Sequence, residues 1–81
     1  MVELKNERIA IKVAPLGAEL QSITDNNGRE YLWQADPDFW PRHSPILFPI
    51  VCSVNNDTYT VDGKQYHLPR HGFARDTEFT L

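Results

Sequence analysis

Apolar and polar residues alternate in several short stretches of the chain, which is the pattern of strands that bury one face. In residues 8–14 (RIAIKVA), isoleucine and valine recur at every second position. Residues 19–24 (ELQSIT) alternate with one slip in phase, and residues 29–34 (REYLWQ) alternate again. Between them, residues 25–28 (DNNG) favour a turn, because Asn and Gly tolerate positive φ. The pattern predicts one strand and, over residues 19–34, one β-hairpin.

The clearest predicted element is a second hairpin over residues 54–69. Two alternating runs in it flank Asp62-Gly63, a dipeptide typical of the two-residue type I′ turn. Residues 78–81 (EFTL) predict the start of another strand. Nowhere do apolar residues recur at the spacing of an amphipathic helix. The pattern therefore predicts an all-β chain.

Prolines predict that the middle of the chain is irregular. Residues 35–45 contain three prolines, and Asp36 or Asp38 could cap a single helical turn at residues 37–40. Residues 45–52 (PILFPIVC) are apolar, but proline cannot join a central sheet ladder. We expect this second stretch to be a buried extended loop or an edge segment.

The predicted hairpins and strands need a facing sheet to cover their apolar sides. An apolar strand over residues 78–81 without a neighbour would also leave an unpaired edge. We therefore expect residues 1–81 to be the N-terminal portion of a single larger β-sandwich domain. The rest of that domain would then be absent, disordered or supplied by another polypeptide.

Composition adds few positive signals. The chain has 81 residues, enough for one domain at most, and a formal net charge of −3. The basic residues are scattered, which argues against a nucleic-acid partner. Histidines and the one cysteine lack metal-ligand spacing, so we expect neither a metal nor another cofactor.

The same composition bears on location. Cys52 is the one cysteine, which excludes an internal disulfide and fits a reducing cytoplasm. The first residues lack the pattern of a signal peptide. The longest apolar run, residues 45–52, is far shorter than the roughly 20 residues that span a bilayer. We expect a soluble cytoplasmic protein without a membrane partner.

The richest polar stretch is residues 68–76 (LPRHGFARD), which directly follows the second predicted hairpin. Loops at sheet ends are where binding groups collect, and glycine at position 72 would allow a sharp turn beside His71. His71 either binds a ligand or is a surface histidine in a turn. The guanidinium of Arg75 suits carboxylate, phosphate or vicinal hydroxyls, and a salt bridge to a nearby acid is the alternative.

Aromatic and basic residues in the irregular middle are further candidates. Trp40, between prolines, is the best candidate for the wall of a pocket, whereas Trp33 and Phe48 are expected in the core. Arg42, with the histidine after it, either lines the rim of a polar cavity or lies in a solvated loop. Cys52 follows two apolar residues, which predicts a buried, inert thiol.

Residues 44–79, SPILFPIVCSV followed by DGKQYHLPRHGFARDTEF, resemble the N-terminal part of the aldose 1-epimerase (galactose mutarotase-like) family. The P-I-L-F-P and H-G-F-A-R motifs resemble a branch akin to the hexose-6-phosphate mutarotases. The opening residues also match the usual start of the family: a strand, a G-A-x-x-x-S-I strand, a turn and Y-L-W. The resemblance covers nearly the whole chain.

This resemblance implies a fold and an activity. The fold is a large antiparallel β-sandwich, the galactose mutarotase-like supersandwich, which would be incomplete in this chain. Enzymes of the family interconvert the α and β anomers of a free or phosphorylated aldose. A glutamate deprotonates the anomeric hydroxyl and a histidine protonates the ring oxygen, with no metal or organic cofactor.

The resemblance also assigns roles to individual residues. His71 matches the histidine of the H-G motif, which helps to hold the sugar, and Arg75 matches the arginine that contacts the anionic group in the hexose-phosphate branch. Arg42 matches loosely a polar residue before P-I-L-F-P. The catalytic histidine and glutamate of the family lie beyond residue 81, so no catalytic residue is expected in this chain. Cys52 stands where related sequences usually have glycine.

Three hypotheses follow. The chain is part of an aldose 1-epimerase, with a sugar or sugar phosphate bound by His71, Arg75, Arg42 and Trp40. Alternatively, it is part of a non-catalytic carbohydrate-binding protein with the same fold, since binding residues are present and the acid–base pair is not. A third reading is a truncated product that does not fold stably alone.

Overall fold

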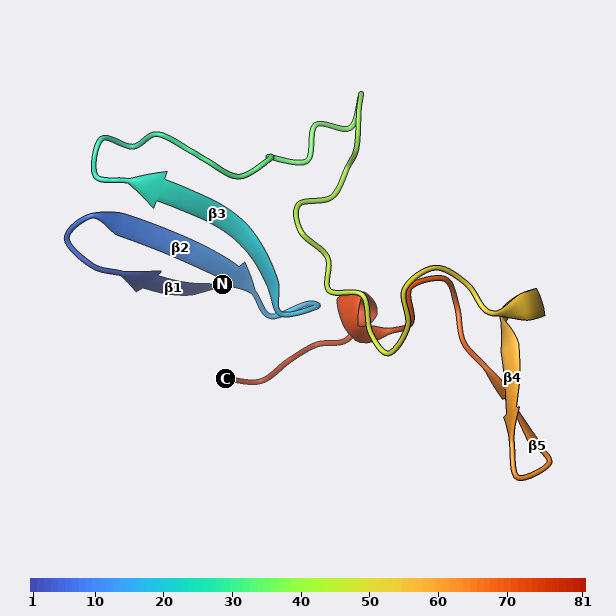
Figure 1. The fold of residues 1–81 in the computed structure, drawn as a ribbon. Coiled ribbons are helices and arrows are strands. Elements are labelled where there is room, and N and C mark those ends of the chain that lie inside the picture. Colours follow the sequence, from blue (N-terminus) through green and yellow to red (C-terminus); the bar gives the residue numbers. More distant parts are fainter.

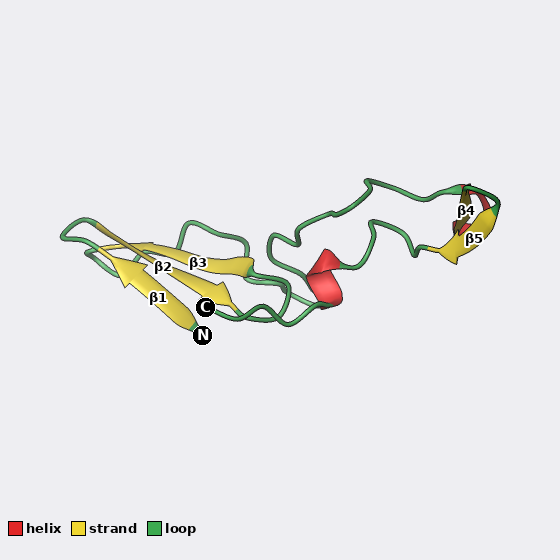
Figure 2. Ribbon diagram, turned by 90° about the horizontal axis from the view of Figure 1, so that it is seen from below, coloured by secondary structure: helices red, strands yellow, loops and turns green.

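A computed structural model describes all residues from 1 to 81, which form two separate antiparallel sheets joined by long loops (Figure 1). Figure 2 shows the two sheets at opposite ends of an elongated molecule. The first sheet has the strand order β1-β2-β3, and the second is a hairpin of β4 and β5. The strands are β1 Val2–Lys5, β2 Ile9–Ala14, β3 Glu19–Asp25, β4 Thr58–Val61 and β5 Lys64–His67.

The helical content is limited to two short 3-10 helices, η1 Asn55–Asp57 and η2 Ala74–Asp76. Neither helix is long or apolar enough to cross a membrane. The absence of any α-helix and the antiparallel pairing in both sheets confirm the predicted all-β class.

A β-bulge in the first sheet explains the phase slip seen in the sequence. Val13 pairs with Leu20, but Lys12 pairs with Ser22, so one residue of β3 between them has no partner. This extra residue places Leu20 and Ile23, which are three apart, on the same face of the sheet. The strands predicted over residues 8–14 and 19–24 are confirmed as β2 and β3.

The strand predicted over residues 29–34 is wrong. This segment makes one isolated bridge to β3, at Glu30, and no ladder. The Glu30 carboxylate forms hydrogen bonds in place of the missing ladder. It accepts the Ile23 N–H at 2.8 Å, the Leu32 N–H at 3.1 Å and the Ser22 hydroxyl. These bonds, that of Ser22 first, lower the pKa of Glu30.

The hairpin predicted around Asp62-Gly63 is confirmed. Both turn residues have positive φ, 52° and 77°, as a type I′ turn requires. On the hairpin surface Tyr59 and Tyr66 stack with their ring centroids 5.4 Å apart. The hairpin projects away from the first sheet (Figure 1).

The proline-rich middle of the chain adopts the predicted single turn. The Asp36 carbonyl accepts the N–H groups of Phe39 and Trp40, each at 3.0 Å, and the Asp36 side chain accepts the N–H of Asp38. Residues 45–52 form a loop with bends at positions 49, 51 and 52 and a cis peptide bond between Phe48 and Pro49. The expectation that this stretch is buried is wrong in this chain, because Ile46, Phe48 and Val51 are exposed and no second layer covers them. Asp36 is therefore the capping residue of this turn.

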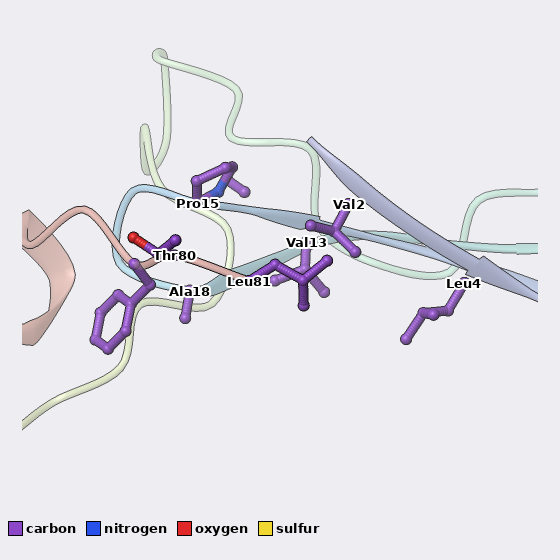
Figure 3. Close-up of a pocket in the computed structure, with 9 residues that line it drawn as sticks. Val2, Leu4, Val13, Pro15, Ala18, Thr80 and Leu81 are labelled. Atoms are coloured by element: carbon purple, nitrogen blue, oxygen red, sulfur yellow. The ribbon is translucent and has the colours of Figure 1, made fainter.

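One face of the first sheet is uncovered and apolar. A hollow of about 400 Å³ lies on it, which we call the sheet hollow. Figure 3 shows Leu81 lying close to Val2 and Val13 across this hollow. The lining residues are Val2, Leu4, Val13, Ala14, Pro15, Ala18, Phe79, Thr80 and Leu81.

The C-terminal residues reach the first sheet without becoming a strand of it. The Phe79 N–H donates to the Pro15 carbonyl at 2.9 Å, and Glu78 forms an isolated bridge with Leu16. The prediction of a strand over residues 78–81 is therefore wrong in this chain, because one isolated bridge does not make a ladder.

Little of the chain is buried. The buried apolar residues are Ala14, Leu68 and Ala74, and no large side chain is fully enclosed. Trp33 is 43% exposed and Phe48 is 58% exposed, so the prediction that both lie in the core is wrong for this chain. The physical reason is that no second layer covers them.

Candidate functional site

A second hollow, of about 330 Å³, lies among the loops rather than on a sheet. We call it the loop hollow. Its walls come from two segments that are far apart in the sequence, residues 40–47 and residues 71–75. The lining residues are Trp40, Arg42, Ser44, Pro45, Leu47, His71 and Arg75.

The two walls meet through a parallel bridge between Phe48 and Gly72. The Phe48 N–H donates to the His71 carbonyl at 3.2 Å, and the Phe48 carbonyl accepts the Phe73 N–H at 2.9 Å. Position 72 requires glycine, because its φ is +74° and an added Cβ would lie 2.1 Å from the Phe48 carbonyl oxygen. This close backbone approach brings His71 beside the 40–47 segment.

The imidazole of His71 is held by the backbone of Cys52. Its Nδ1 accepts the Cys52 N–H at 2.8 Å, and the His71 N–H donates to the Cys52 carbonyl at 2.7 Å. Because Nδ1 is an acceptor, the neutral ring carries its proton on Nε2, which makes no hydrogen bond within the chain. His71 therefore offers one free N–H donor to whatever occupies the loop hollow.

The surroundings of His71 favour the neutral ring. Partial burial lowers the pKa of the imidazole, and the positive charges of Arg70 and Arg75 lower it further. At neutral pH the His71 side chain is therefore an uncharged hydrogen-bonding group. The positive charge around it comes from Arg70 and Arg75.

Arg75 lies on η2 and points guanidinium donors at the same region. Its Nη2 donates to the Arg70 carbonyl at 3.2 Å, whereas its Nε is buried and has no partner. Arg75 forms no salt bridge in this chain, so the alternative of an ion pair with a nearby acid is not what the structure shows. The guanidinium keeps donors free for a ligand.

Trp40 and Arg42 complete the opposite wall. Trp40 is 46% exposed, and its carbonyl accepts the Nε1–H of Trp33 at 2.9 Å. The guanidinium of Arg42 makes no hydrogen bond or salt bridge within the chain. All four candidate residues from the sequence thus lie around one hollow, although they come from two distant segments.

The chemistry of the loop hollow is that of a binding site for oxygen-rich groups. Two guanidinium groups and one imidazole N–H are donors, and an indole gives a flat apolar wall. No carboxylate lines the hollow, so its lining residues include hydrogen-bond donors but no acid–base pair with a carboxylate. No group of three or more His, Cys, Asp or Glu side chains in the chain could hold a metal ion.

Two features of this region differ from the sequence predictions. The thiol of Cys52 is exposed rather than buried, because the hydrogen bonds to His71 hold its backbone at the surface. Ser44 lines the loop hollow but was not among the predicted site residues. Its one signal in the sequence is its place two residues after Arg42, where an extended segment would turn both side chains to the same side.

His43 lies away from the loop hollow. It lines a polar hollow of about 360 Å³ beside β2 and β3, together with residues such as Lys12, Gln21 and Glu30. Of the two neighbours predicted at a polar rim, Arg42 and His43, the structure thus places only Arg42 in the loop hollow.

Comparisons with known proteins show the family to which the chain belongs. The LacX protein of Lactococcus lactis subsp. lactis is 47% identical over 85 residues, which covers 99% of this chain and 28% of LacX. A galactose mutarotase related enzyme from Lactobacillus acidophilus is 45% identical, with a TM-score of 0.90 over 98% of this chain and 27% of that one.

A galactose mutarotase-like protein from Lactobacillus casei is 42% identical, with a TM-score of 0.92 over 99% of this chain and 28% of that one. The chain therefore spans little more than a quarter of the length of the relatives it matches, and its two sheets are part of a galactose mutarotase-like fold. The sequence model of the aldose 1-epimerase family matches residues 1–81, and the chain therefore belongs to this family.

Proposed function

We propose that this chain supplies the sugar-holding wall of an aldose 1-epimerase, which interconverts the α and β anomers of an aldose or aldose phosphate. The observation that carries the proposal is the loop hollow, which gathers His71, Arg75, Arg42 and Trp40 from two distant segments. Membership of the family makes a sugar the expected ligand.

Each of these residues has a distinct part in the proposal. The Nε2–H of His71 donates to a sugar hydroxyl, and the guanidinium groups of Arg42 and Arg75 donate to further hydroxyls or to a phosphate. The indole of Trp40 packs on the apolar face of the sugar ring. These contacts fix the sugar in place.

The proton transfers come from outside the residues described. No carboxylate lines the loop hollow, so the glutamate and the second histidine that open and close the ring would lie in the remaining part of the domain. That remaining part, supplied by further chain or by another polypeptide, is the one macromolecular partner we propose.

We also propose that the reaction takes place in the cytoplasm, without a metal or organic cofactor and without a nucleic-acid or membrane partner. The exposed thiol of Cys52 favours a reducing compartment. Acid–base opening of a sugar ring needs no cofactor.

A chimera with LacX tests the function. Residues 1–81 replace the matching segment of LacX, and polarimetry follows the mutarotation of glucose, galactose and their 6-phosphates. We expect acceleration of at least one sugar over the buffer rate. A folded chimera that accelerates none of them contradicts the proposal.

A variant in this LacX chimera tests the role of His71. We expect His71→Ala to lower kcat/KM about tenfold, the effect of losing a hydrogen bond of about 1.4 kcal/mol. His67→Ala is the matched control, because His67 lies on the exposed hairpin strand β5, outside the loop hollow. Equal effects of the two variants would exclude His71 from the site.

The second candidate function is sugar binding without catalysis. The specific observation in its favour is that the loop hollow holds binding groups but no carboxylate. Isothermal titration calorimetry on the LacX chimera distinguishes the two functions. Binding of a sugar whose mutarotation is not accelerated would favour the binding protein over the enzyme.

A further inference from the structure

We propose that Glu19 and His43 form a positioning pair that holds Arg42 in the loop hollow. Glu19 is the one charged residue among the six buried residues of the chain. Its carboxylate lies 3.5 Å from Nδ1 of His43 and accepts the Nε2–H of Gln21 at 3.1 Å. The inference rests on the proposed function, because it concerns the sugar site.

A second contact one residue further along fixes the same segment. The hydroxyl of Ser44 donates to the Leu20 carbonyl at 2.6 Å. Two successive residues of the loop, 43 and 44, are thereby tied to two successive residues at the start of β3, 19 and 20. The loop therefore meets the sheet through polar contacts at this point.

The side chains of this segment divide between two hollows. Arg42 and Ser44 line the loop hollow, whereas His43 between them lines the polar hollow beside β2 and β3. His43 therefore does not contact the ligand of the loop hollow. It acts through the backbone that carries Arg42.

The buried carboxylate makes this contact necessary. A buried charge without a partner is strongly unfavourable. Removal of His43 takes away the imidazole 3.5 Å from the Glu19 carboxylate and leaves the hydrogen bond from Gln21 as the one remaining contact that offsets its burial. The loop would then move away from β3, because this movement lets water solvate the Glu19 carboxylate. Arg42 would then leave its place in the wall of the loop hollow.

The kinetic test uses the LacX chimera. We expect His43→Ala to raise KM about tenfold and to change kcat by less than about threefold, because ground-state binding is lost and the proton-transfer groups are untouched. We expect His43→Asn to recover most of the loss, because its amide N–H lies close to the place of Nδ1. His67→Ala is again the control. A His43→Ala variant with unchanged KM overturns the proposal.

Trypsin gives a readout that needs no activity. Cleavage after Arg42 requires the 40–45 segment to detach, so we expect His43→Ala to speed it about tenfold. Cleavage after Arg29, in an exposed turn, is the internal control and should not change. If the LacX chimera has no activity but cleavage after Arg42 accelerates, the proposed function fails and the positioning pair stands. Equal cleavage of both proteins overturns the pair.

Discussion

At the scale of single residues, Cys52 is in a conformation that does not suit it. Its φ is +69°, in the left-handed region, because its N–H and carbonyl are both bonded to His71. A residue with a Cβ loses roughly 1–2 kcal/mol there, whereas glycine does not. The positive φ thus gives a physical reason for the glycine that the family resemblance implies at this position.

We expect Cys52→Gly to stabilise the LacX chimera by about 1 kcal/mol or slightly less, because relief of the left-handed strain exceeds the extra entropy of glycine in the unfolded chain. Urea unfolding measures the change. Cys52→Ala is the matched control, since it removes the thiol and keeps the Cβ, and should give no gain. A less stable glycine variant contradicts the explanation.

The imidazole of His71 yields a prediction about pH. Partial burial and the neighbouring arginines lower its pKa below the ordinary value of 6.5, so folding favours the neutral ring. Its contribution to stability is therefore complete above pH 6.5 and is lost as the pH falls from there to the lowered pKa. Protonation also places an N–H on Nδ1 opposite the Cys52 N–H.

NMR titration of the His71 ring protons checks this direction. We expect a midpoint below that of histidine in an unstructured peptide, and an upward move in Arg70→Gln, which removes one of the two positive charges. A midpoint at or above 6.5 would show that the ring is not held as described.

At the scale of elements, the approach of residues 45–52 to residues 71–73 builds the loop hollow. We expect Gly72→Ala to destabilise the LacX chimera by about 3 kcal/mol or more, since the new Cβ would lie 2.1 Å from the Phe48 carbonyl oxygen and the backbone is left-handed. Sugar binding should be lost with it, because the two walls separate.

Gly28→Ala is the matched control for this substitution. Gly28 also has a positive φ, +83°, but nothing lies within 4 Å of its added Cβ. We expect its cost to be about 1 kcal/mol, from conformation alone. Similar unfolding free energies for the two variants would mean that the close backbone contact at Gly72 is not essential.

The elements that the sequence predicted well are those with local turn signals. Asp62-Gly63 determines its own hairpin, and alternation determines β2 and β3. Residues 29–34 and 78–81 alternate equally well but lack a ladder, because strand formation depends on a neighbour that alternation cannot supply. The Glu30 carboxylate instead accepts the backbone N–H groups of Ile23 and Leu32.

At the scale of the whole molecule, the chain is extended. Its radius of gyration is 16.4 Å, whereas a compact chain of this length has about 12 Å. Large apolar side chains such as Leu4, Phe39 and Val51 are well exposed. This surface supports the proposal that further residues of the domain cover it.

We expect the isolated 81-residue chain to unfold without a cooperative transition in urea and to bind the dye ANS, because its few buried side chains form no packed core. Far-UV circular dichroism and ANS fluorescence measure both properties. The LacX chimera is the control and should unfold cooperatively. A sharp transition of the isolated chain would contradict the expectation.

The sequence predicted some parts of the candidate site and missed others. His71 and Arg75 stand in one short polar stretch with a recognisable motif, and the structure places them in one hollow with Trp40 and Arg42. Their role in sugar binding stays a prediction. The contact between Glu19 and His43 joins residues 24 positions apart in loop and strand, and no local pattern marks it.

The hydrogen bonds between Cys52 and His71 join the two ends of the segment 53–70. The β4–β5 hairpin at its tip contributes no residue to the loop hollow. Because the entropy of loop closure changes only slowly with loop length, this tip is the natural place to graft a peptide tag or a fluorescent domain. A label attached at the hairpin would therefore leave the residues of the loop hollow unchanged.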